Sequence, residues 1–135
     1  MHTLNFRFGF DDETGILRLV NVGAWTLADV DRYANVAPDE YAKARQKTQV
    51  MRLLIDNRRA ELFSKEVIAP LGAVGIKLAR PGDRVAILVD SMLMKMQTKR
   101  VMPEGPTNVF VSEAAAIQWL TAYDAGNSQG RTAAA

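Results

Sequence analysis

Two short, mostly apolar runs constrain the fold of this chain more than any other feature. Residues 50–55 (VMRLLI) end before Asp56, and residues 85–89 (VAILV) end before Asp90. Strands that are apolar on both faces are buried strands, typical of parallel pairs in sheets that helices cover. The two runs therefore predict an α/β domain with at least one parallel strand pair.

The segment between these runs has the pattern of a helix. Ser64 is suited to cap its first turn, Pro70 weakens its front, and the turn at residues 80–83 (RPGD) ends it. Its apolar face is marked by Val67, Ile68, Leu71, Val74 and Leu78. A helix that connects two parallel strands of one sheet makes a right-handed crossover.

The residues before the first run predict a hairpin and a long helix. Residues 3–8 alternate polar and apolar side chains, residues 16–22 form a second strand-like run, and a polar turn ending at Gly15 joins them. A helix begins at Thr26. Pro38 lies inside its apolar stripe and predicts a kink or two short helices that meet there.

The residues after the second run predict two helices and one strand. A helix covers residues 91–101, a short strand covers residues 108–111, and Ser112 caps a final helix. The predicted order is β-β-α-β-α-β-α-β-α, in a mixed sheet with helices packed on it. Residues 1–125 are expected to form one domain, and residues 126–135 a flexible tail.

Composition excludes several classes of function. The chain has 135 residues and no cysteine, which rules out disulfides and thiolate chemistry. Its one histidine, His2, lies at the N-terminus, so no Ser-His pair is expected inside the domain, nor any metal site or cofactor motif. A net charge of +2 predicts no nucleic-acid binding. The sequence shows no apolar segment of membrane length and no secretion signal, so a cytoplasmic protein is expected. Because catalytic motifs are missing as well, the protein is not expected to be an enzyme.

Several phrases of the sequence resemble the STAS/SpoIIAA-like group of small bacterial proteins, whose relatives include anti-sigma factor antagonists. They are residues 23–30 (GAWTLADV), 53–56 (LLID), 80–87 (RPGDRVAI), 95–100 (KMQTKR) and 112–120 (SEAAAIQWL). The resemblance implies a SpoIIAA-like fold that binds proteins or a small ligand without catalysis. Anti-sigma factor antagonists carry a phosphorylatable serine at the start of one helix; here Lys65 falls at that position, with Ser64 before it. The resemblance therefore implies no intact phospho-switch.

Basic side chains follow the carboxyl ends of the two buried strands, where open α/β sheets bind ligands. We call Arg58, Arg59, Lys95 and Lys99 the basic rim, and Ser64 and Ser91 begin helices beside it. Backbone N–H groups at those helix starts would favour an anion. The alternative is a solvated basic face. Asp56 and Asp90 are expected at the same edge, either to shape turns or to act as an acid–base pair.

The helix over residues 91–101 is rich in methionine. Met92, Met94 and Met96 spread apolar side chains around more of the helix than one core-facing stripe requires. They would line an apolar pocket, form a homodimer contact, or simply fill the core.

Two functions follow from these patterns. The first is a non-catalytic STAS-like binding module for a protein partner, a second copy of itself, or a small ligand. The alternative is a carrier of a lipid or another amphipathic, anionic small molecule. A carrier requires an apolar cavity of roughly 300 Å³ or more, whereas a solid core with an exposed apolar patch would favour a protein partner.

Overall fold

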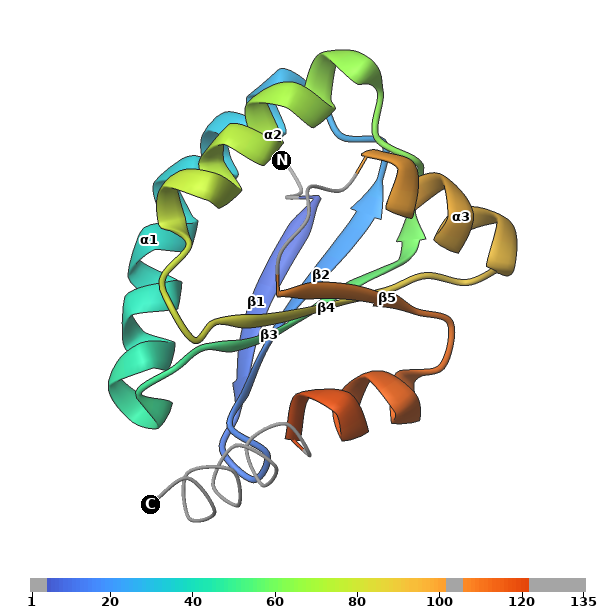
Figure 1. Ribbon diagram of the computed structural model, residues 1–135. Helices are drawn as coiled ribbons and strands as arrows, with labels where there is room; N and C mark the ends of the chain where they lie inside the picture. The colour runs from blue at the N-terminus through green and yellow to red at the C-terminus, as the bar shows by residue number, and fades with distance from the viewer. Residues whose placement is uncertain (1–4, 102–105, 122–135) are drawn as a thin grey trace.

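The chain folds around a five-stranded mixed sheet with helices on both faces, as the computed structural model in Figure 1 shows. The structure describes residues 5–101 and 106–121. The strands are β1 (Phe6–Asp11), β2 (Ile16–Gly23), β3 (Arg52–Ala60), β4 (Arg84–Leu88) and β5 (Thr107–Phe110), in that order across the sheet. β1 and β2 are antiparallel, and all other neighbours are parallel. The predicted mixed sheet and its parallel pair at the two apolar runs are confirmed.

The first two strands form the predicted hairpin. Gly15 adopts a φ of 73°, and its N–H donates to the Asp11 carbonyl at 2.8 Å, which closes the turn. β1 extends to Asp11, beyond the predicted end at Phe8, because its residues pair with β2 along their whole length. Residues 3 and 4, which were predicted to begin this strand, lie outside the described residues.

The helices are α1 (Leu27–Thr48), α2 (Lys65–Leu78), α3 (Met92–Val101) and a last helix described over residues 113–121. α1 and α2 cover one face of the sheet, and the last helix lies on the other (Figure 1). The predicted order of strands and helices is therefore confirmed. The tail predicted at residues 126–135 lies outside the described residues.

The sequence predicted a kink or two short helices at Pro38, and α1 excludes the second of these alternatives. The structure has one helix of 22 residues with Pro38 in its interior. Tyr33 lies before the proline and Tyr41 after it, and both are buried against the sheet. Burying each large apolar side chain stabilises the fold by about 1.5–3 kcal/mol, which offsets the backbone hydrogen bond that the proline removes.

β3 is longer than its apolar run predicted. It continues through Asp56 to Ala60, because its last residues pair with the end of β2 after a shift in register. Asp56 and Arg58 therefore lie within a strand, and not in a connection that follows one. As a result, Asp56 and Arg58, which are two positions apart on the strand, project to the same face of the sheet, where their side chains pair.

Two apolar clusters hold the layers together. The larger lies between the sheet and helices α1 and α2, and includes the aromatic side chains Phe6, Trp25, Tyr33 and Tyr41. The smaller lies on the opposite face, where Ala116 and Leu120 of the last helix pack on Leu54 and Leu88. The sheet is therefore buried on both faces at β3 and β4, as the apolar runs predicted.

Candidate functional site

A cavity of about 480 Å³ lies between the sheet and helices α2 and α3. Leu53 and Ile55 of β3 form part of its floor, Gly72 of α2 and Met94 of α3 lie on its walls, and most of its lining is aliphatic or aromatic. We call it the central cavity. Its volume is within the range of small-molecule sites, which are mostly apolar with a few placed polar groups.

Two asparagines supply polar groups at the central cavity. Between the pairs Val20–Asp56 and Val22–Arg59 the register shifts, so that β3 has two residues where β2 has only Asn21. At this bulge Asn21 Nδ2 donates to Asn57 Oδ1 at 2.7 Å, and both residues line the cavity. Asn21 is only 3% exposed. Its Oδ1 is buried and has no hydrogen-bond partner among the described residues.

Two tyrosine hydroxyls are also buried at the cavity wall. The hydroxyls of Tyr33 and Tyr41 hydrogen-bond to each other. Burial raises the pKa of Tyr33 and, together with the neighbouring Tyr33 hydroxyl, raises the pKa of Tyr41 well above its usual value. Both hydroxyls are therefore neutral at physiological pH and serve as hydrogen-bonding groups, not as bases.

A carboxylate at the cavity is neutralised by an arginine. Asp83 is buried, and its Oδ2 lies 2.7 Å from Arg45 Nη2 while its Oδ1 accepts from Arg45 Nε at 3.2 Å. The same guanidinium donates to the Leu78 carbonyl at 2.9 Å. This bidentate pair joins α1 to the turn between α2 and β4, and leaves no uncompensated charge there.

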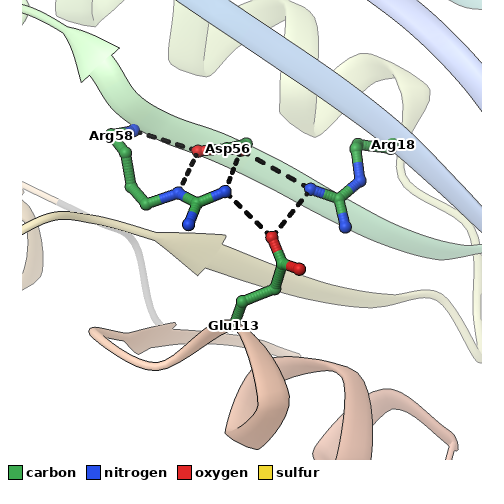
Figure 2. Close-up of polar contacts among 4 residues, drawn as sticks. All are labelled: Arg18, Asp56, Arg58 and Glu113. Atoms are coloured by element: carbon green, nitrogen blue, oxygen red, sulfur yellow. Dashed lines mark hydrogen bonds and ion pairs between the residues drawn. The ribbon is translucent and has the colours of Figure 1, made fainter.

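On the opposite face of the sheet, Arg18, Asp56, Arg58 and Glu113 form an ion-pair network (Figure 2). Arg58 Nη2 lies 2.8 Å from both Asp56 Oδ2 and Glu113 Oε1. Arg18 Nη1 reaches the same two carboxylates, at 3.5 Å and 3.1 Å. Burial raises the pKa of Asp56, but the hydrogen bonds from Arg58 and the charges of Arg58 and Arg18 together lower it by more, so the pKa lies below its usual value. The network joins the sheet to the start of the last helix.

The basic rim is divided by this network. Arg58 is engaged by Asp56 and Glu113, while Arg59 is an exposed residue of β3. Lys95 is half-buried and Lys99 exposed, both on α3. The rim was placed after the ends of two strands, whereas two of its four members lie within β3. Anion binding there stays a prediction.

The two serines beside the rim both cap helices, as predicted for Ser64, while Ser91 was predicted only to begin one. Ser64 Oγ accepts from the Val67 N–H at 3.4 Å, and Ser91 Oγ accepts from the Met94 N–H at 3.1 Å. A role for either serine in binding a ligand stays a prediction.

The methionines of α3 separate into two groups. Met94 lines the central cavity, whereas Met92 and Met96 are 60% and 54% exposed. No residue of α3 is fully buried. A pocket role is therefore supported for Met94, and an interface role for the other two stays a prediction.

The two aspartates that ended the predicted strands do not share a role. Asp56 lies within β3 and is held by Arg58 and Arg18, so it does not shape a turn before a helix. Asp90 is exposed and follows β4.

Within residues 5–101 and 106–121, no group of three or more acidic or histidine side chains could hold a metal ion. No helix in that part of the chain is both long and apolar enough to cross a membrane.

Comparisons with known proteins identify the fold. No protein-family model matches the sequence, and no curated protein does. A solved protein of the DUF3478 family from Shewanella loihica PV-4, described as having a SpoIIAA-like fold, superimposes with a TM-score of 0.68 at 19% identity. The match covers 89% of this chain and 97% of that one. The chain has a SpoIIAA-like fold.

A second solved structure agrees with this assignment. The anti-sigma factor antagonist SpoIIAA, in its unphosphorylated form, matches with a TM-score of 0.58 at 13% identity. The match covers 85% of this chain and 96% of SpoIIAA. The STAS/SpoIIAA-like resemblance of the sequence is thus confirmed for the fold.

In this SpoIIAA-like domain, the sequence analysis missed the two asparagines at the central cavity. A sequence signal for Asn21 was present, because Leu17, Leu19 and Asn21 are every second residue of β2 and therefore lie on the same face of the strand. Period-two alternation therefore places an amide where an apolar residue is expected. No comparable signal existed for Asn57, whose position depends on the bulge.

Proposed function

We propose that this protein binds a small apolar or amphipathic molecule in the central cavity and does not catalyse a reaction. The cavity volume of about 480 Å³ carries the proposal, because it exceeds the roughly 300 Å³ that a carrier requires. Of the two functions that the sequence left open, a cavity of this size favours the carrier of an amphipathic molecule over a module that binds a protein partner.

The chemistry of the cavity wall supports binding over catalysis. Its polar groups include the amides of buried Asn21 and half-buried Asn57, the neutral hydroxyls of Tyr33 and Tyr41, and Asp83, which Arg45 compensates. General acid–base catalysis needs a group whose pKa lies near the working pH. The tyrosine pKa values are shifted away from that range, and amides do not titrate.

Fluorescence titration with N-phenyl-1-naphthylamine, a neutral probe that brightens in apolar surroundings, tests the proposal. Gly72→Phe places an aromatic ring in the cavity; a Cβ at Gly72 would meet nothing within 4 Å, so the backbone tolerates the change. We expect saturable binding to the wild type and at least tenfold weaker binding to Gly72→Phe. Ala73→Phe, at the exposed neighbouring position of α2, is the matched control and should bind as the wild type does. Equal binding to all three proteins would refute the cavity as the site.

A second candidate function is self-association through α3. Four apolar side chains of this helix are more than half exposed: Met92, Leu93, Met96 and Val101. Such a patch is uncommon on a monomer, and two-fold dimers are the commonest oligomers. Light scattering at about 50 µM, a concentration at which modest micromolar affinities are visible, should give a dimer mass for the wild type. Met92→Lys/Met96→Lys should give a monomer, and a monomeric wild type would remove this candidate.

We also propose that no phospho-switch operates at the start of α2. Lys65 is the first residue of that helix, and it cannot carry the phosphate ester of a serine. Ser64 retains a hydroxyl, but it is used as the helix cap. Mass spectrometry of protein from native cells should find residues 64 and 65 unmodified. Stoichiometric phosphate on Ser64 would contradict the proposal.

A further inference from the structure

The carbonyl oxygen of Asn21 is a buried acceptor at the central cavity that has no hydrogen-bond partner among the described residues. Buried polar groups in native proteins are nearly always hydrogen-bonded, so an unsatisfied one indicates a partner that is bound from outside. The amide nitrogen of Asn21 is already occupied, since it donates to Asn57 Oδ1 at 2.7 Å. The acceptor is thus the group that remains for a ligand.

The strand geometry holds this amide at the cavity. Asn21 lies opposite a β-bulge in β3, and its hydrogen bond to Asn57 spans that bulge. Bulges re-aim side chains and are frequent beside binding sites. The terminal torsion of asparagine is soft, so a small rotation brings Oδ1 to a donor in the cavity without moving the strand.

The charges around the cavity indicate whether the polar head group of a bound ligand is anionic or neutral. None of the described residues that line it is lysine, arginine or histidine. Its two carboxylates are Glu61, which is exposed, and Asp83, which Arg45 neutralises. An anionic head group would therefore be desolvated without a counter-charge, which is unfavourable. A neutral head group carries no such penalty.

We propose that the central cavity binds a neutral amphipathic molecule whose polar head donates a hydrogen bond to Asn21 Oδ1. Long-chain primary alcohols and primary amides have this chemistry. The inference rests on the proposed function and narrows it, because it replaces the anionic ligand that the sequence offered as one alternative with a neutral hydrogen-bond donor.

Competition against N-phenyl-1-naphthylamine tests this with three ligands that share one chain. 1-Decanol has a donor, decyl methyl ether has only an acceptor, and decanoate is an anion. For the wild type, we expect 1-decanol to compete at least tenfold more tightly than the ether or decanoate. In Asn21→Leu, which keeps the size of the side chain but removes the acceptor, the preference for alcohol over ether should fall below about twofold.

The possible outcomes separate the two proposals. Binding of all three ligands with equal affinity by the wild type, or an alcohol preference that survives in Asn21→Leu, would overturn this inference and leave the cavity function intact. Tighter binding of decanoate would overturn it in favour of an anionic ligand. Failure of the probe and of every decyl ligand to bind would overturn both. If Asn21→Leu does not fold, Asn21→Val provides the same test with a side chain suited to strands.

Discussion

At the scale of single residues, the cavity face of this protein contains polar groups that hydrogen-bond to one another. The tyrosine pair is the clearest case, because both hydroxyls are buried and each is the other's partner. Removing one member of a buried pair leaves the other unsatisfied, which costs more than the pair contributes. Removing both members avoids that cost.

This asymmetry gives a prediction for Tyr33 and Tyr41. Tyr33→Phe and Tyr41→Phe should each lower the free energy of unfolding by about 1–3 kcal/mol. The double variant should lose clearly less than the sum of the two, since no hydroxyl is left unpaired. Urea denaturation of the four proteins measures this coupling. Strictly additive losses would show that the two hydroxyls act independently.

At the scale of elements, the ion-pair network attaches the last helix to the sheet. Glu113 begins that helix, and its carboxylate meets arginines from β2 and β3. The pKa of Asp56 in the folded protein lies below its unfolded value, because the hydrogen bonds from Arg58 and the charges of Arg58 and Arg18 together outweigh burial. A depressed carboxyl pKa stabilises the fold above the unfolded pKa, and this stability is lost as pH falls through the folded pKa.

The network therefore predicts a specific acid response. Asp56→Asn should lower the free energy of unfolding at pH 7 by about 1–3 kcal/mol, because it removes the buried carboxylate that accepts two side-chain hydrogen bonds from Arg58. The deficit should shrink as pH falls below the ordinary aspartate pKa of about 4, because the wild-type carboxyl then becomes protonated as well. Chemical denaturation across this pH range measures it. Asp39→Asn, at an exposed position of α1, is the control and should track the wild type. A deficit that does not change with pH would contradict the electrostatic origin.

α1 also carries a prediction at this scale. Pro38 is exposed and interrupts the hydrogen bonds of a helix that is held by burial on either side. Pro38→Ala restores a backbone donor and should stabilise the protein by about 1–2 kcal/mol, after the greater freedom of the unfolded chain is taken into account. Thermal unfolding measures the change, and Val36→Ala, also on the exposed side, should shift stability by less than about 0.5 kcal/mol. A lower melting temperature for Pro38→Ala would show that the proline is required.

At the scale of the whole molecule, the two faces of the sheet differ in how they are filled. One face carries the last helix and a small, well-packed cluster, while the other carries α1, α2 and α3 around the central cavity. An empty apolar cavity forfeits packing interactions that a bound molecule restores. Ligand occupancy and global stability should therefore be linked.

This linkage predicts a concentration-dependent melting temperature. A ligand that binds only the folded state at 100 times its Kd stabilises it by about 2.7 kcal/mol. 1-Decanol should raise the melting temperature of the wild type progressively, and should have little effect on Gly72→Phe. Differential scanning calorimetry measures both. An equal rise in the two proteins would indicate that the alcohol acts outside the cavity.

The sequence by itself determined the order of the strands and helices, the buried parallel pair, and the serine caps of α2 and the last helix. Each depends on local patterns: runs and stripes of apolar residues, turn residues, and side chains that reach the backbone three residues away. Only the tertiary structure decided the continuity of α1 through Pro38, the bulge that pairs Asn21 with Asn57, and the engagement of Arg58 by Glu113. The central cavity belongs with these. All four depend on how the strands and helices pack against one another. Asn21 and Asn57 are 36 positions apart in the sequence, and Arg58 and Glu113 are 55 positions apart. No local sequence pattern records contacts between residues so far apart.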